Sequence, residues 1–511
     1  FVLLSLLGMM AALIADKMRP GMVLFSVVVL FLCVGILTPK EMLEGFSNKG
    51  MITVALLFLV SEGIRQSGTL GQVIKKLLPQ GKTTVFKAQL RILPSVAFIS
   101  AFLNNTPVVV IFAPIIKHWA KSVKLPATKF LIPLSYVTIL GGICTLIGTS
   151  TNLVVHGMIL EAGYEGFTMF ELGKVGIFIA IAGIIYLFIF SKRLLPDARP
   201  DTAVPDEEVE EGEKLHRVEA VLGARFPGIN KKLSDFNFQR HYGAEVKEIK
   251  TRNGQRYVDH LEDVVLREGD TLVVMADDTF IPTWGESSVF VLLTNGNDPD
   301  TSGKKKRWLA LILLVLMIVG ATVGELPATK EMFPDIKLDM FFFVCITTII
   351  MAWTNIFPAR KYTKYISWDI LITIACAFAI SKAMVNSGVA DCVAGFIIGL
   401  SDDYGPHVLL AILFVITNLF TELITNNAAA ALAFPLALSI SAQLGVSPTP
   451  FFVVICMAAS ASFSTPIGYQ TNLIVQGIGN YKFTDFVRIG LPLNIITFLI
   501  SVILIPLIWN F

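Results

Sequence analysis

The residues of this chain that could do chemistry are uncharged and interrupt apolar stretches. Asn104-Asn105-Thr106 lie in the middle of one stretch, 85–118, and Thr425-Asn426-Asn427 lie in the middle of another, 407–443. Their amides and hydroxyls, with the backbone carbonyls freed where a helix breaks, suit a bare Na⁺. Helix N-termini that point at one place attract an anion. The two segments therefore predict a site that binds an anion and a cation together.

Two more polar motifs break apolar stretches. Gly148-Thr149-Ser150-Thr151-Asn152 lies within 129–160, and a second motif, 465–472, lies within 451–477. A single Asn or Thr in an apolar helix is most simply explained as a hydrogen-bonding contact between neighbouring helices. Four such motifs in matched pairs favour the binding interpretation.

The pairing comes from an internal repeat. Ser61–Gly68 resembles Ser381–Gly388 at an offset of 320, and Gly148–Gly157 resembles Gly468–Gly477 at the same offset. Asn105 matches Asn426 at an offset of 321. Each half holds an odd number of expected crossings, so the halves should be inverted relative to each other. This is the arrangement of secondary transporters that bind substrate at broken helices near the membrane midplane.

Composition indicates what positions these motifs. Of the 511 residues, 54% are hydrophobic and only 16% are charged, too few for a wholly water-exposed surface. The net charge of +2 argues against nucleic acid as a partner. Stretches of about twenty apolar residues cross a bilayer. Ten crossings are expected, at 1–15, 21–37, 51–67, 129–160, 169–190, 308–324, 339–357, 367–387, 451–477 and 487–509.

The predicted fold is an α-helical polytopic membrane protein built from two inverted repeats, 1–190 and 308–511. Each repeat has five crossings plus one re-entrant hairpin, 85–118 or 407–443. Lys192, Arg193 and the basic run 304–307 place the segment between the repeats in the cytoplasm by the positive-inside rule. The same count puts both termini outside. We expect a multi-pass protein of the cell membrane.

Residues 191–307 form a soluble insert that holds 18 Lys and Arg and 22 Asp and Glu, half of all charged residues in the chain. Its pattern predicts a small α/β domain. Strands are expected at 218–222 and 245–249, and a turn followed by a strand over 266–275. A helix is expected at 235–241, capped by Ser234, with a hairpin turn at Asn253-Gly254. The acidic segment 197–213 indicates a linker.

Several motifs resemble the divalent anion:sodium symporter family, which contains sodium-coupled dicarboxylate, citrate and sulfate carriers. They are Phe102–Pro107, Gly148–Leu153, Ser464–Leu473 and Trp368-Asp-Ile-Leu. The sequence is most similar to the sulfate-permease-like branch with cytoplasmic inserts. The insert, over about 214–280, resembles the C-terminal subdomain of regulators of K⁺ conductance, the TrkA-C type. The resemblance implies Na⁺ as coupling ion, a homodimer and an elevator mechanism, in which the hairpin-bearing domain moves against a fixed scaffold. A small effector of the insert is a further possible partner.

The resemblance also assigns residues. Substrate oxygens would be bound by Asn104, Asn105, Thr106, Thr425, Asn426, Asn427, Thr151 and Thr471. Two Na⁺ sites would be formed by Asn105, Gly148, Thr149, Asn152, Asn426, Thr465, Gly468 and Asn472. Where the family has Ser-Asn-Thr at each tip, this chain has Asn104 in place of Ser and Asn427 in place of Thr. The larger amide of Asn427 narrows the pocket, which favours a small tetrahedral oxyanion such as sulfate.

Other polar residues in apolar stretches have structural explanations. Glu62, Arg65 and Lys382 lie near helix ends, where snorkelling or pairing explains them, and His156 is interpreted as a packing residue. Glu422 is kept as a possible contributor to proton or Na⁺ binding. There is no nucleophile–base pair, phosphate loop or metal-ligand spacing, so the sequence does not indicate an enzyme. Dicarboxylate symport, metalloid oxyanion transport, an insert-gated ion channel and a signalling transceptor remain alternatives.

Overall fold

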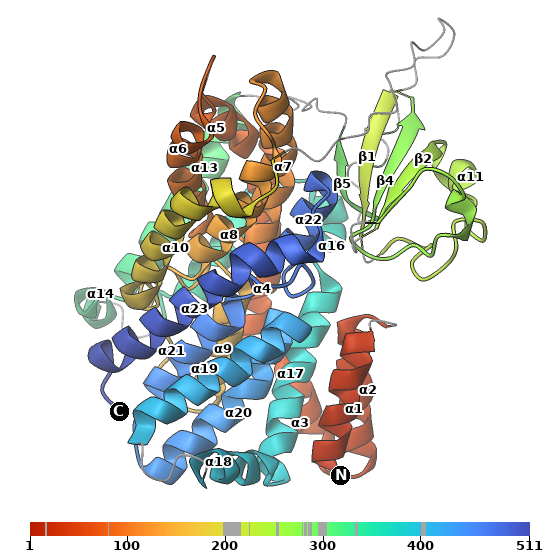
Figure 1. Cartoon of the computed structure of the whole chain (residues 1–511). Helices are drawn as coiled ribbons and strands as arrows, with labels where there is room; N and C mark the ends of the chain where they lie inside the picture. Colours follow the sequence, from red (N-terminus) through yellow and green to blue (C-terminus); the bar gives the residue numbers. More distant parts are fainter. Residues whose placement is uncertain are drawn as a thin grey trace, which may run out of the picture.

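The computed structural model is a mostly helical body with one small sheet beside it (Figure 1). It describes residues 1–15, 18–79, 81–197, 216–223, 225–251, 255–277, 280, 284, 289–294, 304–332, 336–399 and 405–511. The helices of the first half are α1 (Val2–Ala15), α2 (Pro20–Cys33), α3 (Pro39–Glu44), α4 (Lys49–Gln66), α5 (Thr69–Leu77), α6 (Val85–Ser100), α7 (Asn105–Ser122), α8 (Thr128–Gly142), α9 (Ser150–Glu161) and α10 (Gly173–Leu194).

The second half repeats this order after the sheet. Its helices are α13 (Lys304–Gly324), α14 (Pro327–Met332), α15 (Met340–Trp353), α16 (Tyr362–Tyr365), α17 (Trp368–Asn386), α18 (Val389–Gly399), α19 (Gly405–Leu423), α20 (Asn426–Leu444), α21 (Thr449–Ser460), α22 (Gln470–Gly479) and α23 (Phe483–Ile508). The crossings expected at 129–160 and 451–477 are each two helices with an irregular loop between them.

The helical body is built for a membrane. Seven stretches of helix in the described ranges have at least 18 residues and are apolar enough to cross a bilayer, and several shorter apolar helices accompany them. On α10, Ile177, Ile181, Ile185 and Ile189 follow one face at every fourth position, and each is more than half exposed. Such a stripe would be unfavourable against water but suits lipid. The predicted polytopic membrane fold is confirmed.

The repeated Ser-Gly motif has a structural reason. Gly68 lies between α4 and α5 with φ +71°, and Gly388 lies between α17 and α18 with φ +70°. Both glycines adopt the left-handed conformation that ends a helix and redirects the chain, which a residue with a Cβ rarely adopts. The helices α5 and α18 that follow were not among the predicted elements.

The two halves interlock rather than stand side by side. α2 packs on α17 and α15 packs on α4, while α7 packs on α22, α9 on α20 and α10 on α23. Figure 1 shows the hairpin α6–α7 and the small sheet toward one end of the body, and the hairpin α19–α20 and both chain termini toward the other end. The two hairpins therefore enter from opposite ends, as an inverted repeat requires.

The insert folds as a five-stranded antiparallel sheet with the order β3-β2-β4-β1-β5. Its strands are β1 (His216–Leu222), β2 (Glu245–Lys250), β3 (Arg256–Tyr257), β4 (Thr271–Ala276) and β5 (Phe290–Thr294). The turn followed by a strand that was predicted over 266–275 is confirmed, with the strand as β4, whereas β5 was not expected. The predicted turn Asn253-Gly254 lies outside the described residues.

The helix expected at 235–241 is shorter and is capped differently. α11 spans Phe238–Tyr242, and its N-cap is Asn237, whose side chain accepts a hydrogen bond from Arg240 N at 3.0 Å. The predicted cap, Ser234, lies in the preceding turn. Phe238 and Tyr242 on this helix pack into the aromatic core of the insert, so burial of these rings shifts the start of the helix.

Where α6 and α8 cross, the helices touch through glycine. A Cβ atom at Gly141 would lie 2.1 Å from the carbonyl oxygen of Ala97, so only glycine allows this approach. We expect Gly141→Ala to lower the melting temperature of the purified protein and its folded yield, because overpacking costs about 1–3 kcal/mol. The control is Gly8→Ala on α1, where nothing lies within 4 Å of the added atom. Equal stability of the two variants would contradict the crossing.

Candidate functional site

The first predicted tip is a short turn between α6 and α7. α6 ends at Ser100, and α7 begins at Asn105. Asn105 is fully buried: its Oδ1 accepts a hydrogen bond from Ser100 Oγ at 2.8 Å, and its Nδ2 donates to the hydroxyl of Tyr469 at 2.6 Å. One amide thus fixes the turn and contacts the other half of the chain.

The second tip repeats the hydrogen bond of the first. α19 ends at Leu423, and α20 begins at Asn426. Asn426 Oδ1 accepts a hydrogen bond from Thr421 Oγ1 at 2.8 Å, across the same five-residue spacing as Ser100 and Asn105. The sequence match between the tips is therefore a match of hydrogen bonds as well as of residue types.

The loops that break the crossings also repeat each other. In the loop between α8 and α9, Gly148 N donates to Thr145 Oγ1 at 3.1 Å, and Asn152 Nδ2 donates to the Thr145 carbonyl at 2.9 Å. The loop between α21 and α22 has both bonds 320 residues later, at 3.3 and 3.1 Å, on Thr465, Gly468 and Asn472. These bonds satisfy backbone groups that leave the helices and give each loop a fixed shape.

Each tip meets the broken helix of the opposite half. Thr106 Oγ1, at the start of α7, donates to Gln470 Oε1 at the start of α22, at 3.3 Å. In the mirrored contact, Ser150 Oγ and Thr151 Oγ1 on α9 donate to Asn427 Oδ1 on α20, at 3.3 and 3.2 Å. The N-termini of α7 and α22 therefore meet, as do those of α9 and α20.

This arrangement decides the electrostatics of the site. Each helix N-terminus carries unpaired N–H groups and roughly half a positive charge. Among the predicted site residues, none is charged, so helix ends are the source of positive potential there. An anion is favoured beside them, and the short polar side chains leave room for it.

Oxygen atoms gather next to the first tip. Asn105 Oδ1 and the Gly148 carbonyl oxygen both lie close to Gly142, at 2.8 and 3.0 Å from the position that a Cβ atom would take there. In the described structure, Asn152 Oδ1 is buried without a hydrogen-bond partner. Uncharged oxygens are ligands that hard cations prefer.

The second tip has the corresponding cluster. A Cβ atom at Gly468 would lie 2.5 Å from the Thr421 carbonyl oxygen and close to Ser462 Oγ. Thr425 Oγ1 is buried and has no hydrogen-bond partner among the described residues. The residues around both tips therefore fit the predicted pair of Na⁺ sites.

A small cavity lies against the first tip. Asn104 and Ser150 supply polar groups to it, and the facing wall from α4 and α13 is mostly apolar. Its lining residues are Val54, Leu57, Val60, Ser61, Phe102, Leu103, Asn104, Ile147, Ser150, Leu153, Leu314 and Met317. A ligand here would touch one polar edge and an uncharged wall.

Comparison with known proteins shows the family. The family model described as citrate transporter (CitMHS) matches residues 10–440 and 332–511. The chain belongs to this family. It is 30% identical to an uncharacterized transporter of Synechocystis sp., over 95% of this chain and 93% of the relative, and 28% identical to a putative sulfur deprivation response regulator of Chlamydomonas reinhardtii, over 94% and 96%. A probable sodium/sulfate cotransporter of the same alga is 32% identical over 55% of this chain and 31% of the relative.

Membership in this family agrees with the predicted resemblance to divalent anion:sodium symporters and indicates a transporter rather than an enzyme. The chain is a multi-pass membrane transporter. Two of the predicted substrate and sodium residues, Thr471 and Asn472, are bonded to α8. Ser135 Oγ on α8 donates to both Thr471 Oγ1 and Asn472 Oδ1, at 2.8 and 2.7 Å, and these bonds hold the start of α22 against α8.

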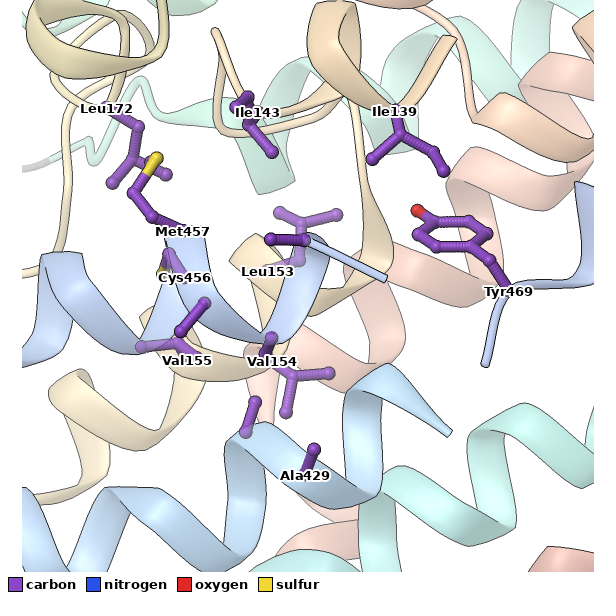
Figure 2. Close-up of a cluster of buried hydrophobic side chains, with 14 of the residues drawn as sticks. Ile139, Ile143, Leu153, Val154, Val155, Leu172, Ala429, Cys456, Met457 and Tyr469 are labelled. Carbon is purple, nitrogen blue, oxygen red and sulfur yellow. The ribbon is translucent and has the colours of Figure 1, made fainter. Parts of the chain in front are cut away.

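Sequence reasoning missed Tyr469 as a functional residue. Its hydroxyl contacts Asn105 Nδ2 at 2.6 Å and Thr149 Oγ1 at 3.1 Å, so it joins the first tip to the first broken-helix loop. Figure 2 shows its ring beside an apolar cluster that includes Ile139. Tyr469 occupies the repeat position of Thr149. Because both repeat positions carry a hydroxyl group, the repeat itself could have indicated that Tyr469 takes part in the site.

The charged residues near the site make contacts that hold helices and loops in place. Arg65 and Glu62 form an ion pair at 2.6 Å within α4, which supports the helix-pairing interpretation. Glu422 Oε1 accepts hydrogen bonds from Ser464 N at 2.9 Å and Asn494 Nδ2 at 2.7 Å, behind the second loop. Glu422 thus anchors that loop to α23.

Proposed function

We propose that this protein is a secondary active transporter that carries a small divalent oxyanion such as sulfate together with Na⁺. The observation that carries the proposal is the meeting of helix N-termini in two mirrored pairs, through Thr106 with Gln470 and through Asn427 with Ser150 and Thr151. Four helix ends aimed at uncharged Asn and Thr groups favour a multiply charged anion. A relative named as a probable sodium/sulfate cotransporter supports sulfate as the substrate.

In this proposal, the substrate site is formed by Asn104, Asn105, Thr106, Thr151, Thr425, Asn426, Asn427 and Thr471. Asn104 has a direct role because it lines the pocket. Asn105 is fully buried, so its contribution is to shape the tip and to donate oxygen to the adjacent cation.

Sodium is the proposed coupling ion. Bound Na⁺ would neutralise charge next to the anion and order the tips. Asn105, Gly148, Thr149 and Asn152 would hold one ion, and Asn426, Thr465, Gly468 and Asn472 the other. The oxygen clusters at Gly142 and Gly468 support these positions. Binding of both ions before the anion would make the tips complete only when Na⁺ is present.

A carboxylate is the second candidate substrate, because the matching family model is described as a citrate transporter. Asn427 argues for the smaller oxyanion: its Oδ1 already accepts hydrogen bonds from Ser150 and Thr151, so the side chain occupies space at the second tip. Sulfate needs less room than a four-carbon dicarboxylate, so the two substrates compete for one site with different affinities.

The test is uptake by the purified protein in proteoliposomes. We expect radiolabelled sulfate to accumulate with an inward Na⁺ gradient and not with an equal K⁺ gradient, and succinate and citrate to enter more slowly. A turnover below channel rates separates a carrier from an ion channel. If none of the three anions enters and none competes, the proposal is wrong.

The transport cycle we propose is an elevator motion of a homodimer. The tips, with α8, α9, α21 and α22, would move together against α4, α13, α15 and α17. The apolar wall that α4 and α13 present to the pocket supports this division, since it can slide past the tips without breaking hydrogen bonds. The insert would lie in the cytoplasm as a TrkA-C-type domain, with both termini outside.

A further inference from the structure

One face of the insert sheet is buried against the helical body. Residues alternate across a strand, and on β1 the side chains of Val218, Ala220 and Leu222 lie in the aromatic core of the insert. Val221 faces the other way and belongs to the buried cluster of the helical body. The sheet is therefore covered on both faces, and the second cover is the transporter itself.

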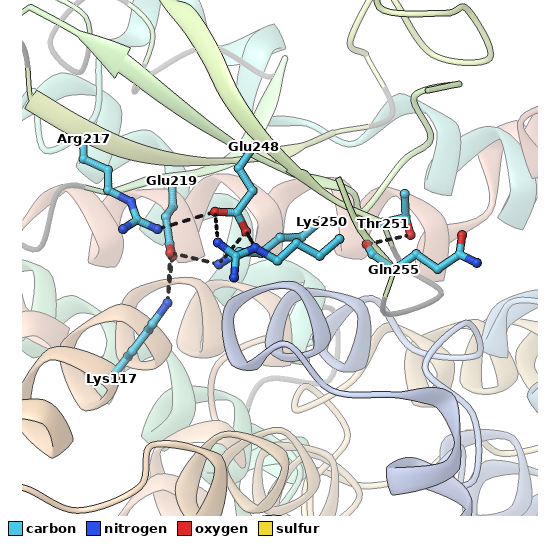
Figure 3. A network of polar contacts seen from close by, with 8 residues as sticks. Lys117, Arg217, Glu219, Glu248, Lys250, Thr251 and Gln255 are labelled. Carbon is cyan, nitrogen blue, oxygen red and sulfur yellow. Dashed lines mark hydrogen bonds and ion pairs between the residues drawn. The ribbon is translucent and has the colours of Figure 1, made fainter. Parts of the chain in front are cut away.

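An ion pair joins this face to the first hairpin. Lys117 Nζ on α7 donates to both carboxylate oxygens of Glu219 on β1, each at 3.0 Å (Figure 3). Burial alone would raise the pKa of Glu219, but the charges of Lys117 and Lys250 lower it to about 2. The carboxylate is thus ionised at all physiological pH values. Removing one partner of a pair this well shielded costs more than removing one partner of an exposed pair.

The same face contacts α22. Gly269, just before β4, lies against Leu473: a Cβ atom at Gly269 would be 3.6 Å from the Leu473 Cβ. Thr271, on β4, is fully buried, and a Cβ at Gly477 would lie 2.4 Å from its Oγ1. The sheet therefore holds both helices whose N-termini meet at the first tip, α7 and α22.

A third contact reaches a different part of the body. Arg225 Nη2 donates to the carbonyl of Ile366 at 3.3 Å. Ile366 directly precedes Ser367, the N-cap of α17, and α17 packs on α2. The insert thus spans from α7 and α22, which carry the tip, to the segment that leads into α17.

We propose that the insert is an autoinhibitory strap: docked as in this structure, it holds α7 and α22 to the lead of α17, and uptake requires its release. The inference rests on the proposed function, because it assumes that the tip-bearing helices move relative to α17. While the insert contacts both the tip-bearing helices and the segment before α17, these two parts cannot move relative to each other. An effector that separates the sheet from α7 would then raise the transport rate.

The first test reverses the ion pair in the full-length protein. Lys117→Glu and Glu219→Lys each place like charges together, so each should release the strap and raise the initial rate of sulfate uptake about fivefold or more, a typical allosteric coupling. The double variant restores an opposite pair at these two positions and should return uptake part of the way to the wild-type rate, because the new lysine on β1 also faces Lys250. Lys121→Glu, one turn along α7, is exposed and is the matched control, with uptake unchanged.

Two results overturn the strap. Unchanged uptake in both single variants means that the contact does not limit transport. Lower uptake in the single variants, rescued by the double variant, means that docking assists the cycle. If the wild-type protein carries no anion, the proposed function fails. The docking of the insert on α22 can then still be tested by the cross-linking described next.

The second test locks the contact. Cysteines at Gly269 and Leu473 would have Cβ atoms about 3.6 Å apart, within the disulfide range. With a protease site placed between Thr294 and Lys305, cross-linking keeps the two fragments together on a gel without reductant. We expect oxidation to stop uptake and reductant to restore it, with each single cysteine variant unaffected. Uptake that continues in fully cross-linked protein contradicts the strap, and absence of cross-linking contradicts the docking. Gly269 has φ +85°, so the charge-reversal test, which leaves the backbone unstrained, stands beside this one.

Discussion

Asn105→Ala and Asn426→Ala should each reduce sulfate uptake to about a hundredth of the wild-type rate or less. In Asn105→Ala, the hydroxyls of Ser100 and Tyr469 lose a buried partner. The Ser100 hydroxyl is left unpaired, which costs about 1–3 kcal/mol, and 1.4 kcal/mol is a factor of ten, whereas the Tyr469 hydroxyl keeps Thr149 Oγ1. The lost amide oxygen also removes one ligand from the proposed cation cluster. In Asn426→Ala, Thr421 Oγ1 loses Asn426 Oδ1 but keeps its bond to the Ala459 carbonyl.

Both variants are measured as initial uptake in proteoliposomes, with size-exclusion profiles and melting temperatures to show that they fold. Asn386→Ala is the matched control. Asn386 is exposed at the end of α17, and its amide donates to the Ile36 carbonyl and to the Glu41 carboxylate. Uptake at the wild-type rate in either tip variant would refute the assignment of that tip.

Asn105 and Asn426 could be named from sequence because the repeat gave two independent copies of each motif. The matched hydrogen bonds of Ser100 with Asn105 and of Thr421 with Asn426 explain why the motifs repeat. The crossings could be predicted because lipid imposes long apolar stretches. Their breaks could be located because small polar residues at membrane depth need a protein environment.

The parts that were not predicted depend on long-range packing. The helix α11 starts at Phe238 because its aromatic rings join the insert core, and that core is formed by residues far away in the sequence. The strand β5 pairs with β1 across about seventy residues. The contact of Glu219 with Lys117 could not be foreseen either, since charge pattern gives no information about which helix faces the sheet.

Tyr469 is the residue of the candidate site that was not predicted from the sequence. A tyrosine beside a predicted loop is most often a packing residue, and its ring does lie in the apolar cluster. Its hydroxyl, however, joins the first tip to a broken-helix loop of each half: Tyr469 belongs to the second loop, and its hydroxyl contacts Asn105 and Thr149 of the first half. Only the fold brings positions 320 or more residues apart to hydrogen-bonding distance.

Tyr469→Phe should therefore lower uptake about tenfold to a hundredfold without unfolding the protein. Phenylalanine keeps the ring and its packing, but Asn105 Nδ2 then has no partner at the tip, a loss of about 1–3 kcal/mol. Because Asn105 Oδ1 lies in the proposed Na⁺ cluster, the half-saturating Na⁺ concentration should rise more than that for sulfate. Tyr186→Phe is the control: its hydroxyl is bonded to the Ile489 carbonyl between α10 and α23, away from the tips. A Na⁺ dependence equal to that of the wild type, or an equal loss in the control, would show that the hydroxyl of Tyr469 only fills space and that the tip is held by other contacts.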